Sequence, residues 1–193
     1  NDFKPDHVDD SLNLIAKYNT DLNTNDTIII QGPPGTGKTY FISRLLEVLN
    51  KENKSVMVAT LANRSLIELA KKYFEIETVN RSVIYKSNLT LEESREVNEL
   101  KPIPKDFFPV AGNILLTTFY KMTGIAVENI SNSIYDYVIL EEASQCFLGT
   151  IAAAKLLGKK VILIGDPLQL APVVRQDNPG NISTNIDLML ESF

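Results

Sequence analysis

The feature that most constrains the fold of this chain is the glycine-rich stretch at residues 31–39, Gln-Gly-Pro-Pro-Gly-Thr-Gly-Lys-Thr. It matches the P-loop pattern of Gly, four residues of any type, then Gly-Lys and Ser or Thr. A short apolar, mostly β-branched run precedes it at 27–30, and apolar residues at helical spacing follow it at 40–49. A surface turn rich in Gly and Pro would not need these flanks. Strand, glycine loop and helix together predict binding of a nucleoside triphosphate.

The residues of this loop have distinct predicted roles. Glycines let backbone N–H groups turn inward around phosphate oxygens, and the helix N-terminus adds roughly half a positive charge. Within the loop, Lys38 is expected to reach the β- and γ-phosphates and to act in catalysis, and the Thr39 hydroxyl is expected to ligate Mg²⁺. The residues predicted to contact the nucleotide are Gly32, Pro33, Pro34, Gly35, Thr36, Gly37, Lys38 and Thr39.

Length and composition are those of one globular domain. At 193 residues, with 44% hydrophobic and 22% charged residues, the chain suits one large domain or one domain with an accessory insert. No apolar run approaches the roughly 20 residues that a membrane-spanning helix needs, so we expect no membrane contact. The single cysteine, Cys146, cannot form an internal disulfide, which favours the cytoplasm or another reducing intracellular compartment. With His7 as the only histidine, a structural zinc site is not expected.

The net charge of −5 argues against broad, non-specific capture of nucleic acid, because that attraction is mostly electrostatic. A narrow strand-binding groove needs only a few local contacts and is not excluded. Two lysine pairs, at 71–72 and 159–160, have no interleaved aromatic residues, and we interpret them as solvated helix ends or strand entries.

Beyond the P-loop, predicted strands alternate with helical segments such as 65–73. Continuous apolar strands of this kind are typical of a parallel sheet that is covered on both faces. The predicted fold class is therefore a three-layer α/β P-loop NTPase domain with a mainly parallel sheet. The apolar runs that predict the remaining strands lie at 55–59, 81–85, 113–118, 137–140 and 160–164.

Two segments depart from this alternation. Near the N-terminus, apolar residues at helical spacing predict a helix over 8–18. Further on, a charged and exposed helix is expected over 91–100, and an irregular stretch over 101–105, where two prolines interrupt the chain. We interpret 75–111 as a small accessory insert in a single domain that spans residues 1–193.

A second candidate motif follows the strand at 137–140, where Glu141 and Glu142 stand side by side. The residue before this strand, Asp136, is interpreted as a turn residue. Ligands bind at the carboxyl ends of strands in open α/β sheets, and two buried like charges there need a cation and a reacting water to compensate them. We therefore assign Glu141 to Mg²⁺, directly or through water, and Glu142 to the catalytic base that orients the attacking water. An exposed acidic helix start is the alternative.

A third candidate motif follows the strand at 160–164. Gly165-Asp166-Pro167 is expected to end that strand abruptly at the same edge of the sheet. Gln169 would then lie near the γ-phosphate, where an amide senses the phosphate without carrying charge, and it is the third catalytic candidate. A turn bracketed by prolines explains the same residues equally well.

Taken together, Gly-Pro-Pro-Gly-Thr-Gly-Lys-Thr at 32–39, Glu-Glu-Ala-Ser-Gln at 141–145 and Gly-Asp-Pro-Leu-Gln-Leu-Ala-Pro at 165–172 resemble the motifs of the superfamily 1 helicases. The match looks closest to the 5′-to-3′ branch that includes the nonsense-mediated-decay RNA helicase, and it covers 27–174 in order. The resemblance implies a RecA-like ATPase domain that uses ATP and Mg²⁺, contacts single-stranded RNA or DNA, and works with a second RecA-like domain in cis that this chain does not contain.

The resemblance also assigns nucleic-acid contacts. Residues 56–63 stand where the family's first strand-contacting loop lies, which points to Thr60 and Asn63, although two residues between them replace the family's Pro and Ser. Residues 116–119 resemble a further strand-contacting motif, with Thr118 at the matching position.

Three departures from the family bear on the site. Glu141 stands where the family has Asp, so the strict geometry of Mg²⁺ requires local adjustment. No glutamine precedes Gln31, and near 15–16, where the family reads adenine, neither side chain can hydrogen-bond a base. None of the three motifs contains an arginine, so the arginines that complete the site are expected from the second domain.

The leading hypothesis is the first motor domain of a nucleic-acid-dependent ATPase that translocates as a helicase on single-stranded RNA or DNA. The alternative is a nucleotide-gated binding module, in which ATP changes partner affinity without unwinding. The ordered motif set favours the motor domain, whereas the acidic charge and the altered contact loop favour the binding module.

Overall fold

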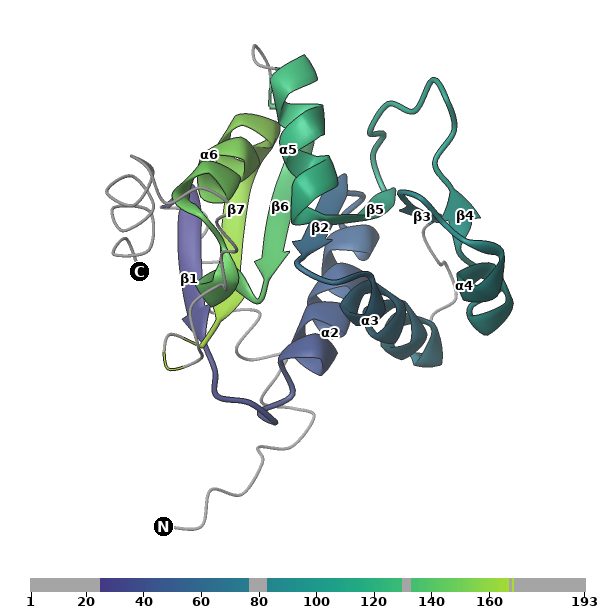
Figure 1. Ribbon diagram of the computed structural model, residues 1–193, viewed down its shortest axis with the longest axis horizontal. Helices are drawn as coiled ribbons and strands as arrows, with labels where there is room; N and C mark the ends of the chain where they lie inside the picture. The colour runs from purple at the N-terminus through teal and green to yellow at the C-terminus, as the bar shows by residue number, and fades with distance from the viewer. Residues whose placement is uncertain (1–24, 77–82, 130–132, 167, 169–193) are drawn as a thin grey trace, which may run out of the picture.

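The computed structural model describes residues 25–76, 83–129, 133–166 and 168. Its centre is one seven-stranded sheet with the strand order β1-β7-β6-β2-β5-β3-β4 (Figure 1). Every pairing between these strands is parallel, which fits the apolar runs in the sequence. The strands are β1 (Thr27–Gln31), β2 (Val56–Thr60), β3 (Ile84–Lys86), β4 (Lys101–Pro102), β5 (Ile114–Thr118), β6 (Tyr135–Glu141) and β7 (Gly158–Gly165).

Helices cover both faces of this sheet. Helices α2 (Lys38–Lys51) and α3 (Asn63–Glu75) pack together on one face, and α5 (Phe119–Glu128) and α6 (Leu148–Leu157) pack together on the other. The short α4 (Leu91–Glu96) lies beside β3 and β4 at one side of the molecule (Figure 1), and the 3₁₀ turn η1 (Ala143–Gln145) follows β6. The predicted three-layer α/β fold with a mainly parallel sheet is confirmed.

Strand β2 shows how the sequence builds these layers. All five of its residues are buried, because side chains that alternate along a strand meet a helix layer on either face. Val56 and Val58 belong to the core cluster under α2 and α3, whereas Met57 and Ala59 belong to the cluster under α5 and α6. A continuous apolar run is therefore needed here. In a strand with one exposed face, apolar and polar residues would have alternated.

The segment 75–111 contributes directly to the sheet, since β3 pairs with β5 and β4 pairs with β3. The helix expected over 91–100 ends at Glu96, and the following Val97 and Leu100 are buried in the core instead of exposed. The expectation of an irregular stretch over 101–105 is wrong at its start, where β4 forms. Its Pro102 is tolerated because β4 is the edge strand, where a missing N–H breaks no ladder.

The interpretation of Asp136 as a turn residue is also wrong, because Asp136 lies inside β6. The Ser55 N–H and hydroxyl both donate to Asp136 Oδ2, at 2.9 and 3.0 Å, and Lys159 Nζ donates to Oδ1 at 2.9 Å. This carboxylate therefore ties together the starts of three neighbouring strands.

The helix expected over 8–18 lies outside the described residues. Within the described part of the chain, no helix has the length and apolar character needed to span a membrane.

Candidate functional site

The P-loop connects β1 to α2, and its glycines adopt the conformations that the motif requires. Gly35 and Gly37 have φ of 79° and 81°, a left-handed region that favours glycine, and Gly37 is the N-cap of α2. Gly32 is required for a different reason: a Cβ there would lie 2.9 Å from Thr36 Oγ1 and 3.3 Å from Lys38 Cγ. No side chain in the described residues caps α2, so its first N–H groups remain available to an anion.

Lys38 is held over this loop from the first turn of α2. Its Nζ donates to the carbonyl oxygens of Gly32 at 2.8 Å and Pro33 at 2.9 Å. The Pro33 carbonyl also accepts from the Thr36 hydroxyl at 2.8 Å. The ammonium group thus lies inside the curve of the loop, the position from which a lysine meets phosphate oxygens.

Thr39 and Glu141 meet across 102 residues of sequence, with Thr39 Oγ1 donating to Glu141 Oε1 at 2.9 Å. Glu141 is 5% exposed, and its second oxygen, Oε2, is buried with no hydrogen-bond partner in the described structure. Burial raises the pKa of Glu141 to about 7, and the charge of Glu142 adds to this, while the Thr39 hydrogen bond and the Lys38 charge oppose it.

An unpartnered buried carboxylate oxygen beside a threonine hydroxyl fits Mg²⁺, which prefers oxygen ligands and takes few from the protein. Across the described ranges there is no cluster of three His, Cys, Asp or Glu residues that would form a protein-only metal cage. The magnesium ligands that the sequence predicted, Thr39 and Glu141, are therefore brought together by the fold.

Glu142 follows in an unusual backbone conformation. Its φ of 60° and ψ of 37° lie in the left-handed region, which is uncommon for a residue other than glycine. The Glu142 carbonyl accepts from Gln145 N at 2.9 Å, which closes the η1 turn after β6. Such left-handed backbone at a residue other than glycine is strained, and strain of this kind clusters at functional sites.

The third motif begins where β7 passes close to this turn. A Cβ on Gly165 would lie 2.8 Å from Ser144 N, so only glycine fits there. Gly165 also accepts from Gly32 N at 3.0 Å, which attaches the P-loop to the end of β7. The predicted catalytic residue Gln169 lies outside the described residues.

The residues predicted to contact nucleic acid lie at the ends of β2 and β5, which pair with each other. Thr60 is fully buried and its hydroxyl donates to the Ala62 carbonyl at 2.7 Å, so it shapes the loop before α3. Asn63 is exposed at the first residue of α3. Thr118 is opposite Thr60 in register and caps α5, accepting from Lys121 N at 3.4 Å.

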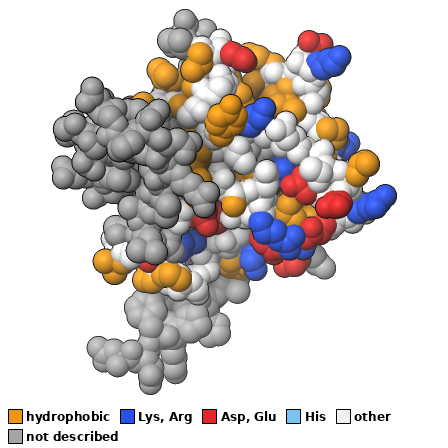
Figure 2. Space-filling model, viewed as in Figure 1, with side chains coloured by type: hydrophobic (Ala, Val, Ile, Leu, Met, Phe, Trp, Pro, Cys, Tyr) orange, Lys and Arg blue, Asp and Glu red, His pale blue; other side chains and the backbone are white. Residues whose placement is uncertain are grey.

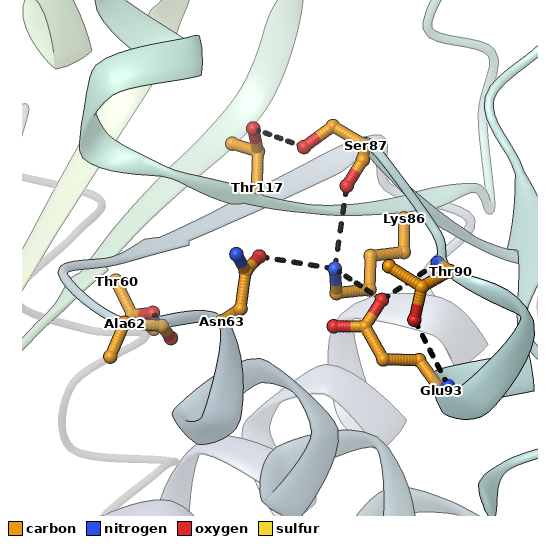
Figure 3. A network of polar contacts seen from close by, with 8 residues as sticks. All are labelled: Thr60, Ala62, Asn63, Lys86, Ser87, Thr90, Glu93 and Thr117. Carbon is orange, nitrogen blue, oxygen red and sulfur yellow. Dashed lines mark hydrogen bonds and ion pairs between the residues drawn. The ribbon is translucent and has the colours of Figure 1, made fainter.

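One charged residue at this edge was missed by the sequence reasoning. Lys86, at the end of β3, is fully buried and contacts Asn63 and Glu93 (Figure 3). The spacing of Thr90 and Glu93 fits a capping box and forms one, but this pattern indicates the start of α4 and not a buried lysine. A lysine inside a three-residue strand gives no periodic signal of its own.

Because all strand pairings are parallel, the carboxyl ends of the strands meet at one edge of the sheet. The P-loop, Glu141 and Gly165 end the three adjacent strands β1, β6 and β7, whereas the residues predicted to contact nucleic acid follow β2 and β5. A phosphate loop facing a buried carboxylate at this edge is the arrangement of the P-loop NTPase domains.

Comparison with known proteins gives the family. A family model described as "AAA domain" matches residues 17–175, and the chain therefore belongs to that family. It is 27% identical over 180 residues to the DNA replication ATP-dependent helicase/nuclease DNA2 of Saccharomyces cerevisiae, covering 88% of this chain and 11% of that protein. It is 23% identical over 243 residues to the DNA polymerase alpha-associated DNA helicase A of the same yeast, covering 92% of this chain and 35% of that protein.

Both of these relatives are named as DNA helicases. The chain spans only a small part, 11% and 35%, of the length of these two relatives. Solved structures with the same fold include the Type ISP restriction-modification enzyme LlaGI, with a TM-score of 0.61 at 13% identity over 91% of this chain and 19% of that one. The UvsW helicase of bacteriophage T4 has a TM-score of 0.55 at 11% identity over 86% of this chain and 53% of that one.

Proposed function

We propose that this chain is the first motor domain of a nucleic-acid-dependent ATPase that translocates on a single strand, with a second RecA-like domain in cis. The observation that carries the proposal is the hydrogen bond of 2.9 Å between Thr39 and Glu141, because it joins the P-loop to the acidic motif at one site. The named relatives that are helicases support the same function.

Within this proposal, the residues of the site divide the work of ATP hydrolysis. Lys38 and the N–H groups at the start of α2 bind the phosphates, and Thr39 and Glu141 hold Mg²⁺, which neutralises phosphate charge when bound. Glu142 orients the attacking water and accepts its proton. Gln169 contacts the γ-phosphate and senses its presence.

The arrangement of strands supports a coupling between nucleotide and nucleic acid. Strand β6 carries Glu141 and pairs directly with β2, whose end leads into the loop before Asn63. The acidic motif, at the end of β6, is therefore only one β-strand away from the residues that we expect to contact nucleic acid. We assign Thr60, Asn63 and Thr118 to that edge, with Thr60 shaping the loop and Asn63 and Thr118 facing the strand.

ATPase stimulation of the full-length protein by single-stranded DNA and by single-stranded RNA tests this function. The expected result is faster steady-state hydrolysis with one or both strands, and unwinding of a duplex with a 5′ single-stranded tail, since we place the chain in the 5′-to-3′ branch. Unwinding only of duplexes with a 3′ tail would overturn that branch assignment.

A nucleotide-gated binding module is the second candidate, and one observation favours it. The charged side chains over α3 and α4 are mixed in sign (Figure 2): Arg64 pairs with Glu68 and Glu96, and Lys71 pairs with both of the same carboxylates. This surface is therefore not a broad basic track. ATP-dependent strand binding without stimulated hydrolysis or unwinding would select the module over the motor.

A further inference from the structure

The end of β3 carries a lysine whose charge is completely buried. Lys86 has 0% of its surface exposed, and its Nζ donates to Asn63 Oδ1 at 3.1 Å, Glu93 Oε2 at 3.1 Å and the Ser87 carbonyl at 3.4 Å (Figure 3). A buried ammonium group is strongly unfavourable unless it is paired and hydrogen-bonded. These three contacts therefore fix where the group lies, and through it they join α3 to α4.

Glu93 is itself held in place by the start of α4. Its Oε2 also accepts from Thr90 N at 2.9 Å, and the Thr90 hydroxyl accepts from Glu93 N at 3.2 Å, which makes a capping box. Partial burial raises the pKa of Glu93, but hydrogen bonds from Thr90 and Lys86 outweigh it and keep the pKa below its usual value. The carboxylate facing Lys86 is therefore ionised at neutral pH.

The contact with Lys86 sets the orientation of the Asn63 amide. An ammonium group can only donate hydrogen bonds, so the acceptor oxygen of Asn63 must face Lys86. The amide nitrogen then points away from Lys86, as Figure 3 shows, and it is a donor at the exposed start of α3. No side chain in the described residues caps the first turn of α3, so the donor shares this edge with backbone N–H groups.

The same network reaches the second strand-contacting segment. Ser87, whose carbonyl accepts from Lys86, also shares a hydrogen bond of 2.8 Å between its hydroxyl and that of Thr117, and both residues are buried. Thr117 immediately precedes Thr118 at the end of β5. Lys86 thus lies between the two segments that we assign to nucleic acid.

We propose that Lys86 is a positioning residue for single-strand binding: held by Glu93, it turns the Asn63 amide so that its N–H groups donate to phosphate oxygens of the strand. The inference rests on the proposed function and deepens it, because it makes the 75–111 segment part of the strand-contacting machinery. In this proposal Lys86 itself does not contact the nucleic acid, because its side chain is fully buried.

The affinity for single-stranded nucleic acid tests this role. It is measured by fluorescence anisotropy of labelled oligothymidylate, for the unsubstituted protein and for Lys86→Met. We expect affinity to fall about tenfold, the effect of losing one hydrogen bond to a charged group. Lys71→Met is the matched control, because Lys71 also joins α3 to α4, through Glu96, and carries the same charge. The control corrects for the loss of one positive charge, and an equal effect in both variants would contradict the proposal.

A double-mutant cycle separates positioning from a purely structural role. If Lys86 acts through Asn63, Asn63→Ala alone weakens strand binding about tenfold, and adding Lys86→Met weakens it less than about twofold more. Independent effects that multiply to about a hundredfold would show that Lys86 does not act through Asn63. A melting temperature that falls in Lys86→Met without any change in strand affinity would reduce Lys86 to a structural residue.

A further test of the amide orientation uses a substitution at Asn63 instead of Lys86. Because Asn63 is exposed, this substitution is not expected to disturb folding. Asn63→Asp keeps an acceptor for Lys86 but removes the outward donor and adds a negative charge. Strand affinity should fall at least about tenfold while the melting temperature is maintained, since the carboxylate pairs with Lys86 and favours a helix N-terminus. Unchanged strand affinity in Asn63→Asp would overturn the proposal. Failure of the unsubstituted protein to bind oligothymidylate or the corresponding RNA would instead overturn the proposed function.

Discussion

Lys38 reaches back from α2 to two carbonyl oxygens of the P-loop, which places its charge where we propose that phosphates bind. Lys38→Ala removes that charge, so we expect ATP affinity to fall and turnover to be abolished. Binding of a fluorescent ATP analogue and steady-state phosphate release measure the two effects. Lys51→Ala, at the exposed end of the same helix, is the control. Unchanged affinity and turnover in Lys38→Ala would refute the P-loop assignment.

The two adjacent glutamates should differ in what they do. Glu142→Gln keeps the side chain's size but removes the base, so hydrolysis should fall about 10²–10⁴-fold while ATP and Mg²⁺ still bind. Glu141→Gln should instead raise the Mg²⁺ concentration needed for half-maximal activity. Glu141 accepts from the Thr39 hydroxyl, and its second oxygen is buried with no hydrogen-bond partner among the described residues. Magnesium titrations of both variants check this division of roles, which identical behaviour would contradict.

At the scale of elements, the starts of β2, β6 and β7 are joined by the Asp136 carboxylate. Partial burial raises its pKa, but hydrogen bonds from Lys159 and Ser55 outweigh this and leave the pKa below its usual value of 3.8. We expect Asp136→Asn to lower the free energy of unfolding at pH 7 by about 1.5–3 kcal/mol, the range for a hydrogen bond to a charged group. Urea unfolding at pH 7 measures it, with the exposed Asp106→Asn as control.

The same carboxylate should make stability depend on pH. A group whose pKa is depressed on folding stabilises the folded state above its unfolded pKa, and this contribution is lost as the pH falls through the folded pKa. The difference in unfolding free energy between wild type and Asp136→Asn should therefore narrow as the pH drops below 3.8. A difference that stays constant from pH 7 into that range would show that Asp136 acts without its charge.

At the scale of the whole molecule, no arginine within the described residues is bonded to the P-loop. Arginine occurs in the described ranges at three positions: Arg44 pairs with Glu47, Arg64 pairs with Glu96, and Arg95 lies on α4. None of them is hydrogen-bonded or ion-paired to a P-loop residue. An arginine supplied from elsewhere is worth about 10³–10⁵ in rate.

We therefore expect residues 1–193 alone to bind ATP, to hydrolyse it very slowly and to unwind nothing. A steady-state ATPase assay on this chain, with and without single-stranded nucleic acid, checks this expectation. Turnover of about one per second would mean that the chain carries its own arginine finger. Arg175, which follows the third motif outside the described residues, would then be the first residue to substitute.

The sequence by itself determined the features that depend on neighbouring residues. Glycine spacing located the P-loop, and continuous apolar runs located the strands of a parallel sheet, because backbone freedom and side-chain alternation are local properties. The same reasoning placed Glu141 at the carboxyl end of a strand. It failed where a residue's surroundings come from elsewhere: Asp136 joined a strand, and Val97 and Leu100 entered the core.

Only the tertiary structure decided which strand ends are neighbours. The order β1-β7-β6-β2-β5 brings Thr39 to Glu141 across 102 residues. Along the same edge of the sheet, it places the residues predicted to contact nucleic acid, after β2 and β5, to one side of the nucleotide site. Strand order depends on how crossover helices pack against the sheet, and spacing along the chain does not encode it. For the same reason the burial of Lys86, and the partners Asn63 and Glu93 that make it tolerable, became visible only when three separate elements met in space.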